Sequence, residues 1–585
     1  MERAAARRVV QGWAWAAGRG LLGARPDLLS VISAGLVLLL AGLMLPPLAI
    51  LVQSSLYTSN IRGEFEAFTW QYYQQVLLNG ELLGPLGNTL GFALGSCGLA
   101  LALGAGLAWI VERTNTPLRR LGYFVAFSSF AIPYILYTIA WLLLLGKGGP
   151  VNALLMSLLQ TDQPPVNVYS LWGMVLVEGL LWSPLAFLML AAVLRSMDPA
   201  LEEAALVSGA GPWRTTMQIS FRLVLPGLLA AVLLVFIRAI EAFDIPALVG
   251  LPSGIQVLTT QVYLDTRTRP PEYGRASALA VLLLLAVGGC LYGYQRLTRE
   301  AHRFQTITGK GYRPRVADLG RWRYLASALL VCYAVLVLLL PLAVLLWASV
   351  MPFYTRPALE AVSLATLRNY ATVLTYPGFL EAMRNTLLLG IGSATLVMGL
   401  MALAAWLLVR GQGAARWLLD PLASLPLVFP GVVLGLALLR LYLFVPIPIY
   451  ATLGILLVAY VTRYMPYGLR YCQAGLIQIH RELEEAAAVS GAAWWPAFRR
   501  VVLPLLSPAF WAGWIFVFLL SAKELSMSVL LAGPRSQVVS VMMFDLWNNG
   551  QIVEVAAFGI LWTAALALAA AVFFVLAQRY GLRPY

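Results

Sequence analysis

EEAALVSGAG at Glu202–Gly211 and EEAAAVSGAA at Glu484–Ala493 are two copies of one polar stretch, 282 residues apart. When the chain is compared with itself at that shift, ten positions of the 17 from 198 to 214 are identical: Leu201, Glu202, Glu203, Ala204, Ala205, Val207, Ser208, Gly209, Ala210 and Trp213. Internal repeats of this kind are typical of membrane proteins built from two related halves. The repeat therefore predicts that this chain is a fused pair of homologous domains.

The sequence around each copy is strongly apolar. Of its 585 residues 60% are hydrophobic and 11% are charged, whereas a soluble domain carries about 25% charged residues. The runs Leu28–Val52, Leu325–Val350 and Ala556–Ala577 are each long enough to cross ~30 Å of hydrocarbon as a helix. Because these runs do not alternate apolar and polar residues, a β-barrel is excluded. We predict an all-α polytopic membrane protein.

Twelve membrane-spanning helices are expected, six in each half. The predicted spans are 28–53, 88–111, 121–145, 170–195, 226–250, 275–296, 324–350, 385–409, 417–442, 452–472, 506–533 and 556–580. The predicted domains are a basic N-terminal tail (1–27), a first transmembrane domain (28–296), a basic linker (297–323) and a second transmembrane domain (324–585).

Basic residues indicate the orientation of these spans. The formal net charge is +14, and Lys and Arg mark loops that stay in the cytoplasm. Basic residues gather in the N-terminal tail, at 113–120, in the linker, at 410–416 and at 579–583. Both termini and both copies of the repeat are therefore expected on the cytoplasmic side. The charge predicts no nucleic-acid partner, since no basic domain interleaved with aromatic residues is present.

The repeated stretch predicts a short helix, a sharp bend and a second helix. Asp198 is a good N-cap before Pro199, and acidic residues in the first turns suit the helix dipole. Gly209 allows a left-handed backbone that ends the first helix. Small alanines beside glutamates form a surface that a partner can approach closely.

This stretch resembles the EAA loop of permease subunits of binding-protein-dependent ABC importers. The second copy matches the family pattern throughout, at Glu485, Ala486, Ala487, Gly491, Val501, Leu503 and Pro504. The first copy matches at Glu203, Ala204, Ala205, Gly209 and Ile219. It departs at Phe221-Arg222, where the family has Leu-Pro.

The resemblance implies partners and roles. Two cytoplasmic ABC ATPase subunits would receive the two loops in their clefts and would bind ATP and Mg, so this chain needs no cofactor and has no catalytic residue. The implied coupling residues are Glu202, Glu203, Ala204, Ala205, Gly209, Glu484, Glu485, Ala486, Ala487 and Gly491. A periplasmic or lipid-anchored binding protein would deliver the solute, and the chain would lie among the lipids of a bacterial inner membrane. Gly309-Lys310 is not a phosphate loop, because Phe304 stands where that motif needs glycine.

The linker bears on the cargo. TITGKGYRPR (306–315) and DLGRWRY (318–324) resemble the ferric-iron branch of fused permeases, which favours ferric iron. Thiamine, aminoethylphosphonate and polyamines stay open as other cargoes of the same transporter class. An ion-coupled secondary transporter and a solute channel are alternatives of another class, but neither needs matching acidic loops.

Charged residues within the predicted spans are candidates for a translocation path or gate. Each costs about 2.5–3.5 kcal/mol at the centre of a membrane helix on insertion scales. The candidates are Arg238, Glu241, Asp244, Lys523 and Glu524, with Glu178 and Arg463 as weaker ones. The shift of 282 places Lys523 opposite Glu241, which predicts an ion pair between the halves. A structural pair that only fixes helix packing is the equal alternative.

The sequence predicts neither a metal site nor a disulfide. The two histidines, His302 and His480, lie outside the predicted spans. The four cysteines, Cys97, Cys290, Cys332 and Cys472, lack the CxxC spacing of zinc sites. If iron is the cargo, selectivity is expected to reside in the binding protein, with Tyr134, Tyr137, Tyr464 and Tyr467 offering phenol oxygens at most.

Overall fold

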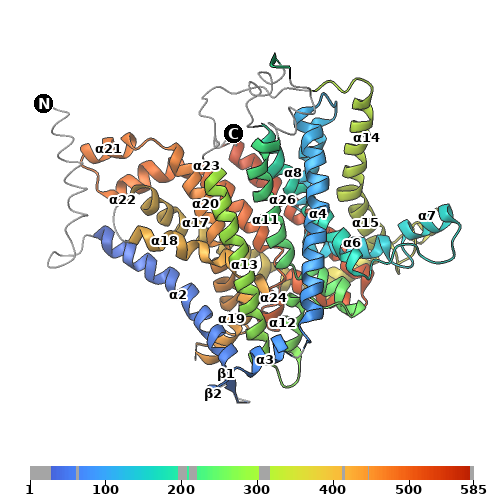
Figure 1. Ribbon diagram of the computed structural model, residues 1–585, viewed down its shortest axis with the longest axis horizontal. Coiled ribbons are helices and arrows are strands. Elements are labelled where there is room, and N and C mark those ends of the chain that lie inside the picture. Colours follow the sequence, from blue (N-terminus) through green and yellow to red (C-terminus); the bar gives the residue numbers. More distant parts are fainter. Residues whose placement is uncertain are drawn as a thin grey trace. The chain divides into compact units, whose positions relative to one another are not determined.

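The computed structural model describes residues 28–60, 65–78, 80–195, 207–209, 221–301, 317–411, 415–445 and 447–579. Within these ranges almost all regular structure is helical (Figure 1). The exception is a two-stranded antiparallel sheet formed by β1 (Tyr57–Ser59) and β2 (Phe65–Phe68). The prediction of an all-α membrane protein is confirmed.

Nine helical stretches of the described chain are long and apolar enough to cross a membrane: Leu29–Leu56, Leu83–Arg113, Tyr134–Leu159, Leu171–Arg195, Tyr273–Arg296, Trp322–Val350, Phe379–Arg410, Trp494–Ser521 and Ile552–Phe573. A tenth is the pair Trp417–Val428 and Gly431–Phe444, which is bent by 107°. The other two predicted spans coincide with α11 (Phe221–Ile240), whose apolar stretch is shorter, and with α20 (Leu453–Gln478).

The chain folds into two compact units. Unit 1 combines Met1–Phe68, Gly378–Met542 and Ala564–Tyr585, and unit 2 combines Thr69–Pro377 and Met543–Thr563. In unit 1, α2 (Leu28–Leu56) packs against α18 (Ala415–Ser424) and α19 (Gly431–Phe444). The first helix of the first sequence half thus packs with helices of the second half.

Unit 2 contains the reciprocal exchange. The stretch formed by α14 (Trp322–Ala334), η5 (Val335–Leu339) and α15 (Leu340–Val350) begins the second sequence half. It packs against α5 (Arg119–Ser129) and α6 (Tyr134–Leu145) of the first half. Each unit therefore takes its first long helix from the other half of the sequence.

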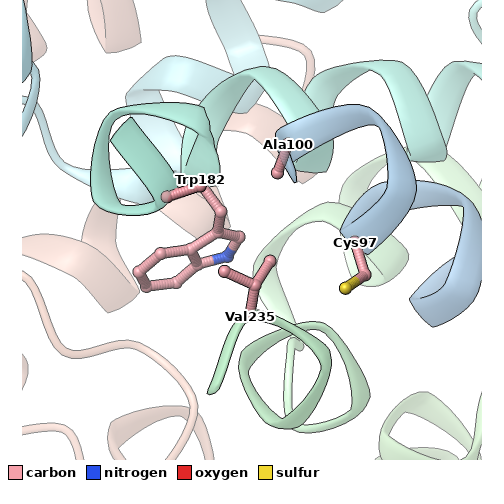
Figure 2. Packing of buried hydrophobic residues seen from close by; sticks show 5 residues of the cluster. Cys97, Ala100, Trp182 and Val235 are labelled. Atoms are coloured by element: carbon pink, nitrogen blue, oxygen red, sulfur yellow. The ribbon is translucent and has the colours of Figure 1, made fainter. Parts of the chain in front are cut away.

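The core of unit 2 is built on α4 (Leu83–Arg113) and α8 (Leu171–Arg195), which run side by side. Gly104 makes this contact close, because a Cβ there would lie 2.6 Å from the Cβ of Ala186. Small residues at helix contacts are the usual means of close packing in membranes. Figure 2 shows Trp182 of α8 turned toward Ala100 and Cys97 of α4 and Val235 of α11.

The core of unit 1 repeats this arrangement with α17 (Phe379–Arg410), α20 and α23 (Leu503–Ser521). A Cβ at Gly468 of α20 would lie 2.6 Å from Val397 of α17. α4, α8 and α11 therefore correspond to α17, α20 and α23.

The third predicted span of each half is broken at a proline. In unit 2, α5 ends at Ser129 and α6 begins after Pro133; in unit 1, η7 (Leu425–Val428) ends before Pro430 and α19 follows. Both prolines have extended backbone, with ψ of 139° and 148°. Because the residue before a proline is also driven out of the helical region, the chain turns at this point.

The predicted spans 226–250 and 506–533 are wrong at their C-terminal ends. The long helices stop at Ile240 and Ser521, just before Glu241 and Lys523. In unit 2 the chain then continues through the short helical turns η2 (Pro246–Gly250) and η3 (Leu251–Ser253) to α12 (Leu258–Arg267). In unit 1 it continues through α24 (Ser528–Leu531) to α25 (Val539–Asn548), whose first residues belong to unit 1. Hydropathy did not reveal these breaks, because the segments that follow them are themselves largely apolar and buried.

Candidate functional site: coupling loops and intramembrane charges

The second copy of the repeat forms the predicted helix, bend and helix. α21 (Glu482–Val489) carries Glu482, Glu484 and Glu485 in its first turn, where negative charge suits the dipole. Gly491 ends it with φ of +86°, a left-handed conformation in which glycine is favoured. α22 (Trp494–Ala497) and η8 (Phe498–Val502) then lead directly into α23. The loop thus leads directly into α23, the fifth long helix of the second sequence half.

Glu484 ties α21 to the C-terminal end of α17. Its Oε1 accepts a hydrogen bond from Nε of Arg410 at 2.8 Å, and its Oε2 accepts one from the Trp406 indole at 2.9 Å. Arg410 also donates to the carbonyl oxygen of Ile479 at 2.6 Å. The Trp406 ring stacks on Trp494 of α22 with centroids 5.9 Å apart. α17 therefore contacts both short helices of the loop.

Glu485 faces outward. It pairs with Arg481 one helical turn away, at 3.3 Å, and both side chains are well exposed. Ala486 is exposed beside it, and Val489 is 66% exposed. The two adjacent glutamates therefore have different environments: Glu484 binds the chain's own helices, whereas Glu485 belongs to an open surface of small and apolar side chains.

Most of the first copy lies outside the described residues, including the predicted coupling residues Glu202, Glu203, Ala204 and Ala205. Residues 207–209 are described. Gly209 has φ of +81° and Val207 is 89% exposed, as at the matching Gly491 and Val489. The left-handed glycine expected from the sequence is thus found in both copies, and the coupling role of these residues stays a prediction.

In unit 2, the predicted charges form a short network around Trp182. Arg238 Nη1 lies 2.6 Å from Glu241 Oε1, and its guanidinium lies 5.7 Å from the centre of the Trp182 ring. The Trp182 indole donates to Glu178 Oε1 at 2.8 Å. Asp244 follows beyond the end of α11. Arg238 and Glu241 are therefore brought together as the i, i+3 spacing predicts.

In unit 1, Glu524 is held from two sides. Its Oε2 accepts from the Tyr464 hydroxyl at 2.8 Å, and its Oε1 accepts from the backbone N–H of Met527 at 3.1 Å. Lys523 is 5% exposed. Because Glu241 and Lys523 belong to different compact units, the predicted ion pair between them stays a prediction.

Arg463 is bound at the break before α19. It donates to the carbonyl oxygen of Pro426 at 3.3 Å and to that of Phe429. The last carbonyls of a helix have no partner within the helix, and in the membrane an unsatisfied carbonyl costs several kcal/mol. The buried guanidinium therefore stabilises the broken helix.

Two motifs that the shift of 282 does not align recur at a shift of 297. Trp109 and Arg113 at the end of α4 match Trp406 and Arg410, and Asn88-Thr89-Leu90 matches Asn385-Thr386-Leu387. The shift changes because 25 residues, including α7 (Pro150–Leu159), separate α6 from α8, whereas eight separate α19 from α20. A comparison that allowed this insertion would have found both motifs.

Within the described residues, no group of three His, Cys, Asp or Glu side chains is arranged to hold a metal ion.

Comparison with known proteins gives two matches to one family, described as "Binding-protein-dependent transport system inner membrane component", over residues 99–297 and 396–583. Each match covers most of one sequence half, and together they cover more than half of the chain.

Several curated proteins are similar to this chain. The "Ferric transport system permease protein FbpB" of Actinobacillus pleuropneumoniae is 25% identical over 84% of this chain and 71% of its own. The "Putative ferric transport system permease protein FbpB 1" of Haemophilus influenzae is 25% identical over 81% and 74%. The "Putative 2-aminoethylphosphonate transport system permease protein PhnU" of Salmonella typhimurium is 33% identical over 45% of this chain and 89% of its own.

Proposed function

From the fact that this chain belongs to the binding-protein-dependent transport system inner membrane component family, we propose that it is the membrane-spanning permease of an ATP-driven importer and that its cargo is ferric iron. The main support for this proposal is that the family matches twice within one chain. The chain is thus a multi-pass membrane subunit of a transporter and not an enzyme. Two matches in one chain support a single polypeptide that does the work of two permease subunits.

The share of this chain that each relative covers supports ferric iron as the cargo. The two ferric transport permeases align with more than four fifths of this chain, so they share its fused two-domain form. The aminoethylphosphonate permease has a higher identity but aligns with less than half of the chain. The linker that resembles the ferric branch at 306–324 supports the same choice.

The partners follow from the two copies of the EAA stretch. We propose two cytoplasmic ABC ATPase subunits, which hold ATP and Mg, and one periplasmic or lipid-anchored solute-binding protein. Both termini and both coupling loops then lie on the cytoplasmic face of a bacterial inner membrane. The contact of Asn115 with Asp318 and Leu319 supports this topology, because it places the loop after α4 and the end of the linker on one side of the membrane.

The geometry of the second loop suggests how force reaches the membrane helices. An ATPase that grips the open surface around Glu485 would move α21. That movement passes to α17 through Glu484 and Arg410, and to α23 through α22 and η8. Two long helices of unit 1 therefore respond to one docking event, which is what alternating access requires.

The test is import into proteoliposomes that contain the chain with its ATPase and are supplied with its binding protein. We expect ferric iron to enter only when ATP and the binding protein are both present. Aminoethylphosphonate, thiamine and a polyamine serve as competing cargoes under the same conditions. Import of one of these compounds in place of iron would refute ferric iron as the cargo. Import driven by an ion gradient without ATP would refute the assignment as an ATP-driven importer.

Docking is tested by charge reversal. Glu203→Lys and Glu485→Lys are each expected to weaken copurification of the ATPase, and the double variant to abolish it. Arg470→Glu is a matched control, because Arg470 is an exposed charge of unit 1 outside the loop. Full ATPase association in the double variant would refute the proposed docking surface.

A further inference from the structure

The segments that follow α11 and α23, the fifth long helix of each sequence half, are fixed at their far ends by an asparagine and a threonine in both units. We call 241–257 in unit 2 and 522–538 in unit 1 the gate segments. Each begins directly after a long helix and ends directly before a short one, α12 or α25. Most of their residues are buried, as expected where a membrane helix is interrupted, because the backbone groups freed at a break must be satisfied within the protein.

In each unit a threonine of a long helix, α4 or α17, caps the start of the short helix, α12 or α25. The N–H of Leu258, the first residue of α12, donates to Thr89 Oγ1 of α4 at 2.9 Å. The N–H of Val539, the first residue of α25, donates to Thr386 Oγ1 of α17, also at 2.9 Å. First-turn N–H groups have no partner within their own helix. Val257 and Val538 have no side-chain oxygen that could serve as an N-cap, and the acceptor for the N–H of the next residue comes from another helix.

Each threonine is prepared for this role by its own helix. Thr89 donates its hydroxyl proton to the carbonyl oxygen of Pro85 at 2.6 Å, and Thr386 donates to that of Ala382 at 2.8 Å. A hydroxyl has one proton and two lone pairs. Donation to the preceding turn therefore leaves an oxygen lone pair oriented to accept the incoming N–H. Both threonines are almost fully buried.

The preceding asparagine adds a second bond in each unit. Asn88 Nδ2 donates to the carbonyl oxygen of Gln256 at 3.0 Å, and Asn385 Nδ2 donates to that of Gln537 at 3.1 Å. The backbone is thus held on both sides of Val257 and of Val538. The carbonyl group of the preceding residue is bound by an asparagine, and the N–H of the following residue is bound by a threonine.

A third bond joins the start of each gate segment to the short helix that follows it. The hydroxyl of Thr259 donates to the carbonyl oxygen of Ala242 at 2.7 Å, and the hydroxyl of Ser540 donates to that of Glu524. Ala242 follows Glu241 and Glu524 follows Lys523, so the charged start of each segment is joined to the fixed end. Three equivalent bonds in two halves of low sequence similarity indicate a common constraint on the segments themselves.

We propose that Asn88 with Thr89 and Asn385 with Thr386 are positioning residues for transport: they fix the far ends of the two gate segments, so that movement of the fifth helices bends these segments. This inference rests on the proposed function as a transporter. In unit 1 the chain connects the coupling loop to the gate segment mechanically. α23 starts at the coupling loop and ends at the gate segment, whose other end is bound to α17. A shift of α23 along α17 is then taken up between 522 and 538.

The test replaces the acceptor without changing the shape. Thr89→Val and Thr386→Val, singly and together, remove the hydroxyl and keep the branched side chain. Thr89→Ser and Thr386→Ser restore the hydroxyl. Thr138→Val is the matched control, because the fully buried Thr138 hydroxyl donates only to Tyr134 of its own helix. Asn385→Ala provides an independent removal of the second bond.

Hydrogen exchange measured by mass spectrometry on the whole chain in nanodiscs reports the anchoring without any cargo. We expect exchange about tenfold faster at the start of α12 in Thr89→Val and at the start of α25 in Thr386→Val, since a lost hydrogen bond to a buried amide has about this effect. The serine variants and Thr138→Val are expected to exchange at wild-type rates in these peptides. Unchanged exchange in the valine variants overturns the anchoring.

Transport is read as cargo moved per ATP hydrolysed, in proteoliposomes with the ATPase and ferric-loaded binding protein. We expect the double valine variant to lose about tenfold in this ratio, through its import rate and not through ATPase assembly, and the double serine variant to recover it. Faster exchange with a wild-type ratio makes the four residues merely structural and overturns the proposal. A wild-type complex whose ATPase subunits hydrolyse ATP without iron import instead contradicts the proposed function, while the exchange result still decides the anchoring.

Discussion

Glu484 and Arg410 lie 2.8 Å apart between Oε1 and Nε, and this contact joins the short helix α21 to the end of the long helix α17. Both side chains are largely buried, at 14% and 16% exposure, whereas those of the neighbouring pair Glu485 and Arg481 are exposed by 40% and 55%. Burial decides which of two adjacent glutamates serves the protein's own architecture and which is available to a partner.

Removal of the first pair is therefore expected to matter more than removal of the second. Arg410→Ala should lower the free energy of unfolding by about 1–3 kcal/mol, because it leaves Glu484 partly buried without its charged partner. Arg481→Ala should change it by less than about 1 kcal/mol. Thermal unfolding of the purified permease in detergent measures both. Equal effects would contradict the assignment of Glu484 as the anchor.

The pair Arg238–Glu241 in unit 2 is accessible to a double-mutant cycle. We expect Arg238→Gln, Glu241→Gln and the double variant to give a coupling energy of about 1–3 kcal/mol, because Glu241 is nearly buried and the Nη1–Oε1 distance is 2.6 Å. The same cycle on the exposed helical pair Arg481 and Glu485 is the control, with about 0.3–0.5 kcal/mol expected. Unfolding in detergent supplies both values. A coupling near zero for Arg238 and Glu241 would show that their contact does not stabilise the fold.

Arg463 is expected to be required for the broken helix before α19. Arg463→Met removes the donor from the carbonyl oxygens of Pro426 and Phe429 and should destabilise the permease by about 2–4 kcal/mol. Arg470→Met, on the same helix but with a 55% exposed side chain, should cost less than about 1 kcal/mol. Apparent melting temperatures of the two variants are compared side by side. Equal melting temperatures would mean that water, and not Arg463, satisfies these carbonyls.

Glycine is required at the bend of the coupling loop by its backbone and not by crowding. A Cβ at Gly491 would meet no atom within 4 Å, but φ is +86°, so Gly491→Ala should cost about 1–2 kcal/mol through strain alone. Gly491→Asn should cost less, because asparagine tolerates this conformation. Gly399→Ala is the control: its Cβ site is equally open but its backbone is helical. If all three variants unfold alike, the bend is not strained.

The end of the linker should be insensitive to pH over the physiological range. The backbone N–H of Gly320 and the side chain of Asn115 both donate to Asp318, which lowers the pKa of this carboxyl below its ordinary value of 3.8. Because the pKa is lowered in the folded state, the contact contributes its full stability at any pH above the ordinary pKa. This stability is lost only as the pH falls through the folded pKa. The protection factors of amides 317–320, which are exchange rates corrected for the pH dependence of intrinsic exchange, are expected to stay constant from about pH 5 to pH 8. A change within that window would contradict the pairing.

Hydropathy and repeat spacing were sufficient to predict the class of the protein and the position of its helices. Apolar length reports the thickness of the bilayer, which is why every predicted span overlaps a helix. The same signal does not report where a helix breaks: residues 241–250 and 522–531 are largely apolar and buried although the long helices have ended. Breaks depend on local backbone partners such as Thr259 and Met527, which hydropathy does not count.

The candidate site was predictable where chemistry is local. Glu241 directly follows α11, and its N–H still donates to the carbonyl oxygen of Ile237, so its pairing with Arg238 at i, i+3 follows from helix geometry. The left-handed glycines follow from the repeated motif. The contacts of Glu484 with Trp406 and of Leu258 with Thr89 join segments far apart in sequence. Only a comparison of the halves that allowed for the insertion at α7 would have indicated them.

The exchange of first helices has a consequence for biogenesis. α2 ends at Leu56, but the helices that cover it in unit 1 lie in the segment that begins at Gly378 and are synthesised later. Until the ribosome has passed that point, α2 must wait in the bilayer with lipid on its future contact face. A chain severed within the linker would leave each fragment missing a helix that the other supplies. Fusion into one polypeptide thus guarantees equal amounts of two lobes, neither of which is complete without the other.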